Sequence, residues 1–287
     1  MPETPRLNGV IAALESGKPA FVTFSGASPE NAQAIGDANY DGVVFEMEHN
    51  PYDIRALRDS LQYMLNRKQI VDRGTLAPAV TPLVRIPPNG GELNQWIAKQ
   101  VLDSGVYGIV WPHVSTVEEA RNAMVACRYP RPKDAPLYEP AGQRGDAPAA
   151  AARYWGLSQQ EYYRKADVWP LAPHGEVVVA IMCEEVRAVE NLPDILEQVP
   201  GITAVIIGEG DLSQDLGFPR QYDHPKVVEA MNRVLETCKR FNVVCGHPHV
   251  DPSNVERLLE QGYRWLMPAP TRSFAALELG RKVSGRA

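Results

Sequence analysis

The chain has 287 residues, of which 44% are hydrophobic and 22% are charged, values typical of a soluble globular protein with a substantial core. Its net charge is −6 and it has no cluster rich in lysine and arginine, so nucleic-acid binding is not expected. No apolar run reaches the roughly 18–20 residues that span a bilayer, and the first residues lack the apolar core of a signal peptide. The four cysteines are widely spaced and suit a reducing compartment, so we expect a cytoplasmic protein that does not bind membranes.

Apolar runs alternate with amphipathic segments along the first half of the chain. Ser28 followed by Pro29 is typical of a helix start, because serine caps a helix and proline suits its first turn. Short runs rich in β-branched residues predict strands buried on both faces. The predicted strands are 19–24, 42–45, 82–86 and 107–114, and the later helices of this half are 51–69, 92–105 and 115–129.

The regular alternation stops at residues 130–175, which contain seven prolines. The segment also holds five aromatic residues between Tyr154 and Trp169, too many for a disordered linker. We predict an ordered excursion with one or two short helices that covers the site or forms a subunit contact.

The second half of the chain restores the alternation. Its predicted strands are 177–183, 204–208, 243–246 and 264–268, and its helices are 184–198 (interrupted near Pro193), 224–242, 252–262 and 273–283. Eight strands that alternate with helices predict a (β/α)8 TIM barrel forming one domain over residues 1–287. A doubly wound α/β sheet is the competing architecture.

Four of the predicted strands end on polar residues suited to carbonyl chemistry. The second strand runs into Glu46, Glu48 and His49, the third ends at Arg85, the fifth at Glu184 and the sixth at Asp211. Parallel barrels place their active sites at the C-terminal ends of the strands, so this pattern favours an enzyme.

Glu184 and Asp211 follow neighbouring strands and are candidate ligands of a hard divalent cation such as Mg²⁺ or Mn²⁺, with Co²⁺ as a further option. The alternative is that they form an ion pair or cap a helix, and adjacent Glu185 is interpreted as a solvated helix acid. Gly210 would let backbone N–H groups approach a 2-oxo acid carboxylate, or it serves only a tight turn.

His49 is the candidate general base, with Glu46 as the carboxylate that would orient its ring, although it could be a structural loop histidine. Arg85 would contact an anionic substrate, or pair with a structural carboxylate. His113, His247 and His249 also follow strands and could be metal ligands, substrate contacts or loop histidines. No lysine ends a predicted strand, which disfavours imine catalysis and favours polarisation by a metal.

The order of short motifs resembles the HpcH/HpaI aldolase family over about residues 8–283. EMEH resembles the D-x-E-H block of the family, RIPPNG its R-P-P block and VLDSGV its L-L-D-x-G-A block. MCEE resembles the Q-I-E-T block, and GEGDLS resembles G-P-x-D-L-S. Five features depart from the family. Met182 stands in place of its glutamine, Glu46 stands in place of its aspartate, the motifs GHPH and PAPTRS look atypical, and the excursion at 130–175 is longer than in the short bacterial enzymes.

The resemblance implies a metal-dependent aldolase of 4-hydroxy-2-oxo acids that releases or consumes pyruvate, or a similar 2-oxo acid, and an aldehyde. It implies a metal held by Glu184 and Asp211, His49 and Glu46 in proton transfer, and Arg85 on the enolate. Met182 would lie beside the keto acid, in the place of the family's glutamine, so the hydrogen bond of that glutamine would be lost. His113, which follows the fourth strand, is a further candidate contact of the substrate on its position alone. It also implies a homo-oligomer, often a trimer of dimers, with Asp103 near the aldehyde at a subunit boundary. A citrate-lyase-β-like acyl-CoA lyase and a non-catalytic barrel that binds organic acids are the alternatives.

Overall fold

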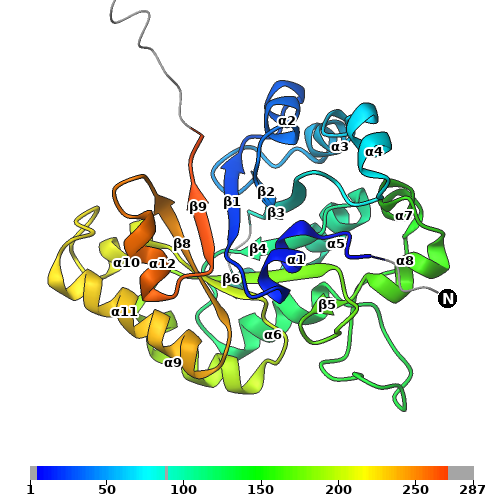
Figure 1. Cartoon of the computed structure of the whole chain (residues 1–287). Coiled ribbons are helices and arrows are strands. Elements are labelled where there is room, and N and C mark those ends of the chain that lie inside the picture. Colours follow the sequence, from blue (N-terminus) through cyan, green and yellow to red (C-terminus); the bar gives the residue numbers. More distant parts are fainter. Residues whose placement is uncertain (1–4, 88–89, 271–287) are drawn as a thin grey trace, which may run out of the picture.

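The computed structural model describes residues 5–87 and 90–270. The helix predicted at 273–283 lies outside the described residues. Within them, eight parallel strands close into a barrel, which confirms the predicted (β/α)8 fold and excludes the doubly wound sheet (Figure 1). The barrel order is β1-β2-β3-β4-β6-β7-β8-β9, and β9 pairs with β1 to close the ring. The eight barrel strands are β1 Ala20–Ser25, β2 Gly42–Glu46, β3 Thr81–Arg85, β4 Gly108–Trp111, β6 Val177–Cys183, β7 Ala204–Ile207, β8 Val244–Val250 and β9 Trp265–Pro268. A ninth short strand, β5 Val168–Trp169, is not part of the closed ring.

The barrel strands are apolar because the interior and the surrounding helices cover both of their faces. All seven residues of β6 are buried, as are all four of β7. β4 is shorter than predicted, and it ends at Trp111. Pro112 after it has no N–H to donate to a ladder, and His113 has a left-handed backbone with φ 50°. The chain therefore leaves β4 at Trp111, at the end of the barrel where the C-terminal ends of the parallel strands lie. This end is called the barrel mouth below.

Helices follow most strands, in the order expected for this fold. They are α1 Gly9–Glu15, α2 Pro29–Gly36, α3 Ile54–Tyr63, α4 Arg67–Arg73, α5 Gln95–Ser104, α6 Val117–Ala126, α7 Ala149–Trp155, α8 Gln159–Lys165, α9 Val186–Gln198, α10 Glu209–Asp215, α11 Pro225–Arg240 and α12 Val255–Gln261, with a 3₁₀ turn at Gly90–Glu92. Ser28 caps α2 by accepting a hydrogen bond from the backbone N–H of Asn31, as its sequence predicts.

The helices differ from the sequence prediction in four places. The first is α10, whose segment was expected to form only a turn. The segment 51–69 forms two helices because Asn66 accepts the backbone N–H of Gln69 and starts α4 anew. Pro193 lies inside α9 without ending it, and the helix runs on to Gln198 because its buried face continues to Leu196. α1 was not predicted; the side chain of Asn8 caps it.

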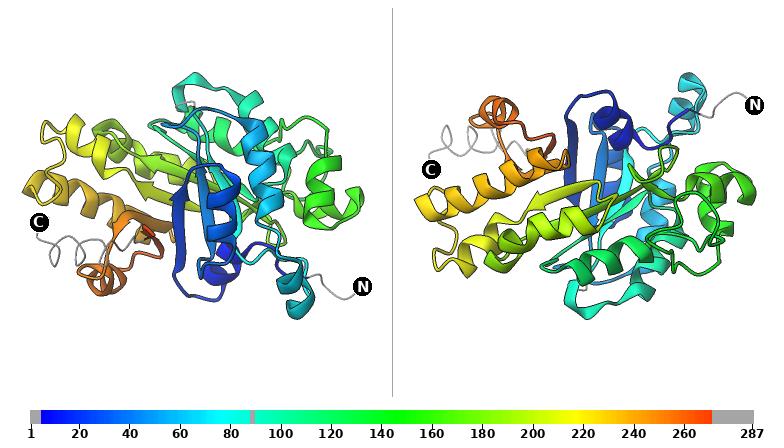
Figure 2. Two further views of the ribbon diagram at one scale, coloured as in Figure 1. Left: turned by 90° about the horizontal axis from the view of Figure 1, so that it is seen from above. Right: turned by 90° about the horizontal axis from the view of Figure 1, so that it is seen from below.

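The excursion at 130–175 is ordered and contains the two short helices α7 and α8, as predicted. Figure 2 shows them on the side of the barrel away from α11 and α12. The ring of Trp155 stacks on Tyr107 at a centroid distance of 4.2 Å, and its indole N–H donates to the carbonyl of Gly105 at 2.8 Å. These contacts attach the excursion to the chain segment that enters β4.

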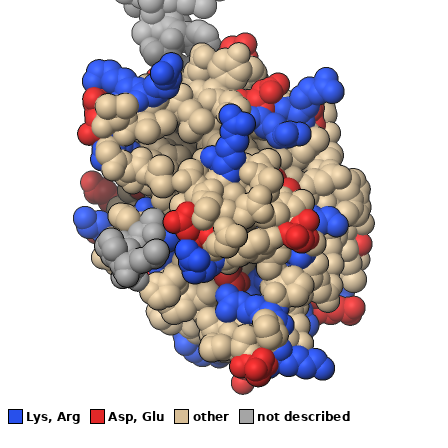
Figure 3. All heavy atoms as spheres, turned by 90° about the vertical axis from the view of Figure 1, so that its right-hand side faces the viewer, with Lys and Arg blue, Asp and Glu red and all other residues tan. Residues whose placement is uncertain are grey.

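The charged side chains on the face of Figure 3, which is the right-hand side of Figure 1, are of both signs. Lysines and arginines are interspersed with aspartates and glutamates there, so this face carries no uniformly basic surface. No helix in residues 5–87 and 90–270 is long and apolar enough to cross a membrane.

Candidate active site

The C-terminal ends of β2 and β3 bring three charged side chains into one network. Glu46 and Arg85 are paired residues in the parallel ladder. Both Nε and Nη2 of Arg85 donate to one oxygen of Glu46, the Nε bond measuring 2.8 Å. Nη1 of Arg85 lies 2.9 Å from Oε2 of Glu48. The guanidinium also stacks over the ring of Phe24 at 4.6 Å. Of the two roles considered for Arg85, pairing with carboxylates is therefore the one seen in the structure.

Glu46 holds the backbone of the following loop and not the ring of His49. Its Oε1 accepts the backbone N–H groups of Glu48 at 2.7 Å and of His49 at 3.2 Å. The exposed imidazole of His49 lies nearest Glu48, with 3.7 Å between Nε2 and Oε2. The carboxylate beside the ring of His49 is therefore that of Glu48, and not that of Glu46 as the sequence predicted.

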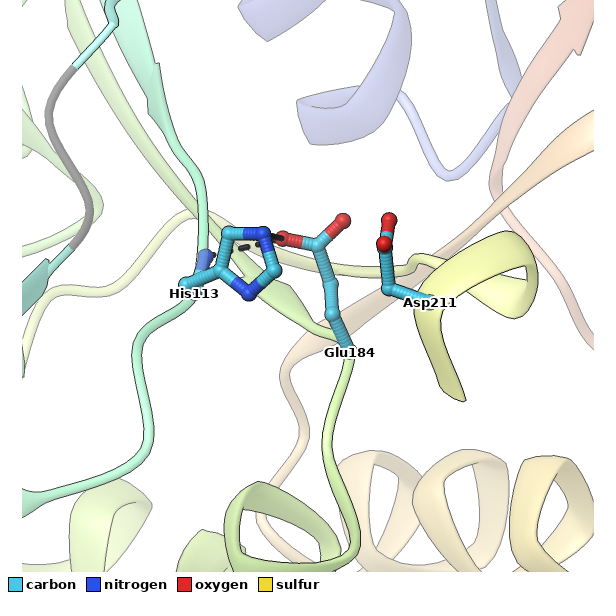
Figure 4. Close-up of side chains that lie close together, drawn as sticks. All are labelled: His113, Glu184 and Asp211. Carbon is cyan, nitrogen blue, oxygen red and sulfur yellow. Dashed lines mark hydrogen bonds and ion pairs between the residues drawn. The ribbon is translucent and has the colours of Figure 1, made fainter. Parts of the chain in front are cut away.

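Glu184, Asp211 and His113 converge at the same end of the barrel (Figure 4). Glu184 follows β6 and is buried, Asp211 lies exposed in the first turn of α10, and His113 follows β4. One ligand atom from each side chain can be chosen so that all three lie within 4.8 Å of one another. The backbone N–H of His113 donates to Oε2 of Glu184 at 2.8 Å.

Burial changes the proton affinities of this cluster. Burial raises the pKa of Glu184 to about 7, although His113 opposes the shift. Burial also raises the pKa of Glu48, against the opposing charge of Arg85. Burial alone would lower the pKa of His113, but the carboxylates of Glu184, Glu185 and Glu48 outweigh it and raise that pKa. Buried acids facing one another without enough cations are typical of a functional site.

The donor set fits a divalent cation. Glu46, Glu48, Glu184 and Asp211 bring four carboxylates, and Arg85 is the cation that pairs with two of them. In the part of the chain that the structure describes, no lysine or arginine forms an ion pair with Glu184. Oε2 of Glu48 is buried and, among the described residues, makes an ion pair with Arg85 but no hydrogen bond. A cation between Glu184 and Asp211 would neutralise this excess of negative charge.

The remaining predicted site residues lie in different environments. Met182 is buried, with its sulfur 3.6 Å from Nη1 of Arg85. Gly210 lies in the first turn of α10. Apart from its neighbours in the chain and the backbone of its own helix, no described atom lies within 4 Å of where a Cβ would stand. Asp103 lies on α5, where it accepts a hydrogen bond from Arg144 of the excursion at 2.9 Å. Asp103 therefore links α5 to the excursion through Arg144. Met182 and Gly210 lie at the barrel mouth.

His247 and His249 form a separate cluster with Glu209. His249 bonds Glu209 through Nδ1, and Nε2 of His247 lies 3.8 Å from the same carboxylate. They line a cavity of about 270 Å³ between β8, α11 and α12, together with Tyr222 and Tyr263. Both histidines are therefore partners of the buried carboxylate of Glu209, away from the cluster of Glu184 and Asp211.

The sequence analysis gave Glu48 no role of its own and interpreted Glu185 as a solvated helix acid, but both lie in the site. Oε1 of Glu185 lies 3.2 Å from Nδ1 of His113, and its Oε2 accepts a hydrogen bond from Ser115 at 2.8 Å. Glu185 is thus not a freely solvated acid. The sequence signal for a role of Glu185 was its position directly after the end of a strand. That signal is weak, because the side chains of adjacent residues such as Glu184 and Glu185 usually point in different directions.

Comparison with known proteins agrees with the fold and identifies the family. Residues 21–267 match the model of the family described as HpcH/HpaI aldolase/citrate lyase. The chain is 29% identical to a hydroxypyruvate/pyruvate aldolase of Roseobacter denitrificans over 92% of this chain and 91% of that protein. It is 33% identical to a 2-keto-3-deoxy-L-rhamnonate aldolase of Klebsiella pneumoniae over 83% of this chain and 78% of that one.

The fold has the same relatives. The crystal structure of a HpcH/HpaI aldolase/citrate lyase family protein from Burkholderia cenocepacia superposes with a TM-score of 0.76 at 27% identity. The alignment covers 97% of this chain and 98% of that one. The family model, which matches residues 21–267, spans all the barrel strands except the first residue of β1 and the last residue of β9. The chain is therefore a member of the HpcH/HpaI aldolase/citrate lyase family.

Proposed function

We propose that the protein is a divalent-metal-dependent aldolase that cleaves or forms a 4-hydroxy-2-oxo acid. The observation that carries the proposal is the convergence of the Glu184 and Asp211 carboxylates at the barrel mouth that also holds Arg85. In cleavage a base removes the proton of the 4-hydroxyl, the bond between C3 and C4 breaks, and an aldehyde is released. The electron pair of that bond forms the enolate of the 2-oxo acid, which takes up a proton at C3 to give a product such as pyruvate. The names of the aldolase relatives support this reaction class.

Glu184 and Asp211 are the residues that would hold the cation, since both offer hard oxygen ligands. When bound, Mg²⁺ or Mn²⁺ supplies Lewis-acid polarisation of the 2-oxo acid, and it is worth several kcal/mol in reactions of this kind. Gly210 leaves open space beside Asp211, which suits close approach of the substrate carboxylate.

Arg85 is assigned to the negative charge that develops on the C2 oxygen as the C3–C4 bond breaks. Its guanidinium is held between Glu46, Glu48 and the ring of Phe24, so its orientation is set before the substrate binds. A charge fixed in advance costs no reorganisation during the reaction.

His49 is assigned to proton transfer at C3 of the 2-oxo acid. Its ring is exposed at the mouth, and its backbone is anchored by Glu46. An imidazole near neutral pH can both give and take this proton, as the two directions of the reaction require. Glu48 is its nearest carboxylate.

The test is a screen for aldol synthesis and cleavage. Pyruvate and hydroxypyruvate are each incubated with a panel of aldehydes, with Mn²⁺, with Mg²⁺ and with a chelator. We expect carbon–carbon bond formation that requires the metal and is lost in Glu184→Gln. Turnover of an acyl-CoA substrate in place of the aldol reaction would favour the lyase alternative, and binding of an oxo acid without turnover would favour the binding barrel.

The expectation of a cytoplasmic homo-oligomer, with the site completed near Asp103 at a subunit boundary, belongs to the same proposal. Light scattering on the purified protein tests the assembly. A monomer at micromolar concentration that has full aldolase activity would exclude a site shared between subunits.

A further inference from the structure

The imidazole of His113 lies beside the two carboxylates assigned to the cation (Figure 4). Ligands about 2.0–2.6 Å from one ion stand at most about 5 Å apart. The mutual limit of 4.8 Å for one atom each of His113, Glu184 and Asp211 is therefore within the reach of a single ion.

The backbone fixes where the imidazole starts. Residue 113 has φ 50°, an uncommon conformation for a residue with a side chain. Pro112 before it cannot extend β4, and the backbone N–H of His113 donates to Oε2 of Glu184 at 2.8 Å. The same carboxylate that would bind the ion therefore holds the histidine in place.

Glu185 selects the ring nitrogen that faces the cluster. Its Oε1 lies 3.2 Å from Nδ1 of His113, and a carboxylate can only accept, so in the neutral ring Nδ1 carries the proton. Ser115 donates to the other oxygen of Glu185 at 2.8 Å and fixes its orientation. The lone pair is then on Nε2, which lies 3.9 Å from Glu184 and 3.7 Å from Glu48. A carboxylate, an imidazole and a metal in this order form a recurrent arrangement in metalloproteins.

A further observation points to a cation at this place. The side chain of Glu48 is only 8% exposed, and its Oε1 lies 3.7 Å from Nε2 of His113. Within residues 5–87 and 90–270, its Oε2 makes an ion pair with Arg85 but no hydrogen bond. Its contact with Arg85 at 2.9 Å is an ion pair that Arg85 shares with Glu46. Negative charge therefore surrounds Nε2 of His113 on two sides.

We propose that His113 is a third protein ligand of the divalent cation, through Nε2, and that Glu185 is the residue that positions it. This inference rests on the proposed metal-dependent function. An imidazole ligand favours Mn²⁺, Co²⁺ and Zn²⁺ over Mg²⁺, which prefers oxygen. The site is thus one for a transition-metal ion and not for Mg²⁺ alone.

The decisive measurement is pulsed electron paramagnetic resonance of the Mn²⁺-loaded protein, which detects a directly bound nitrogen-14. We expect nitrogen modulation in the native protein and its loss in His113→Asn and His113→Gly. Asparagine and glycine both tolerate φ 50°, so these variants keep the backbone conformation. His49→Asn, which removes the other imidazole near Glu48, is the matched control and should keep the signal.

Metal titration gives a second readout. His113→Asn should weaken Co²⁺ binding by about 10–100-fold or more and leave Mg²⁺ binding within about threefold. Glu185→Gln should keep the nitrogen signal but weaken Co²⁺ binding by about tenfold, since the ring loses its positioning partner. Glu190→Gln, at an exposed position of the same helix α9, should change neither.

The outcomes separate this inference from the proposed function. Tight Mn²⁺ binding without nitrogen modulation, or modulation that survives in both His113 variants, would overturn the role of His113 and leave Glu184 and Asp211 as ligands. Loss of the signal in His49→Asn alone would transfer the role to His49. A native protein that binds no Mn²⁺ would overturn the metal-dependent function itself.

Discussion

Glu46 and Arg85 stand opposite each other at the ends of β2 and β3, and their side chains form a two-pronged ion pair at the barrel mouth. Their side chains are 12% and 11% exposed. A guanidinium this deeply buried requires a partner, and the parallel register supplies one although 39 positions separate the two residues in the chain.

Glu46→Gln should therefore lower both stability and activity. Arg85 keeps Glu48, so the expected loss in free energy of unfolding is about 1–3 kcal/mol, as for a buried charged hydrogen bond. Urea unfolding measures it. The control is Asp72→Asn in the exposed pair with Lys68, which should cost less than about 0.5 kcal/mol. Equal losses in the two variants would contradict the role given to Glu46.

Glu184→Gln should abolish metal-dependent turnover and leave the fold intact. The amide keeps the size of the side chain and can still accept the backbone N–H of His113. Isothermal titration with Mn²⁺ measures the loss of metal binding, and circular dichroism shows whether the fold is intact. Full turnover by this variant in the presence of a chelator would rule out the metal site.

Metal affinity should depend on pH because burial raises the pKa of Glu184 to about 7. Below pH 7 a proton competes with the cation, so affinity should fall by up to about tenfold per pH unit, and above pH 7 it should level off. In the metal-free protein the folded state keeps this proton more tightly than the unfolded state. Its contribution to stability is therefore present at pH 4.5 and below, and is lost as pH rises toward 7. Glu184→Gln should reduce the pH dependence of stability between about pH 4.5 and 7, and Glu48, whose pKa burial also raises, should supply what remains. A pH-independent Mn²⁺ affinity in the native protein would contradict the competition between proton and cation.

Gly208→Ala should weaken metal binding, whereas Gly210→Ala should leave it unchanged. A Cβ at Gly208 would overlap the carboxylate of Glu184 and displace it, whereas a Cβ at Gly210 would meet nothing within 4 Å. We expect Gly208→Ala to lose Mn²⁺ affinity. Gly210→Ala should keep that affinity but raise the KM for the 2-oxo acid if the substrate approaches there. Titration and steady-state kinetics separate the two, and equal Mn²⁺ affinities would refute the placement of Glu184.

His49→Ala should slow the exchange of deuterium into the methyl group of pyruvate by about 10²–10⁴-fold, the usual contribution of a general acid or base. Proton magnetic resonance follows the exchange. His224→Asn is the control, because asparagine preserves the helix cap that His224 provides for α11. Unchanged exchange in His49→Ala would remove His49 from proton transfer.

Local sequence pattern was sufficient for the fold and for most of the polar residues at the barrel mouth. Most positions of the barrel strands are apolar, so the ends of three of them are visible where Glu46, Arg85 and Glu184 interrupt the runs. The pattern failed where a local interaction overrode it, as at Asn66, which starts a second helix, and at Pro193, which packing retains inside α9.

The sequence by itself determined the (β/α)8 barrel, the family and the set of side chains at the strand ends, because these follow from short-range periodicity and ordered motifs. Only the tertiary structure decided which of those side chains meet. The register of β2 against β3 pairs Glu46 with Arg85, and the left-handed turn at His113 brings its ring between Glu184 and Glu185. Such partners lie about 40–70 residues apart in the chain, and their contact depends on strand register and loop path, which no local pattern encodes.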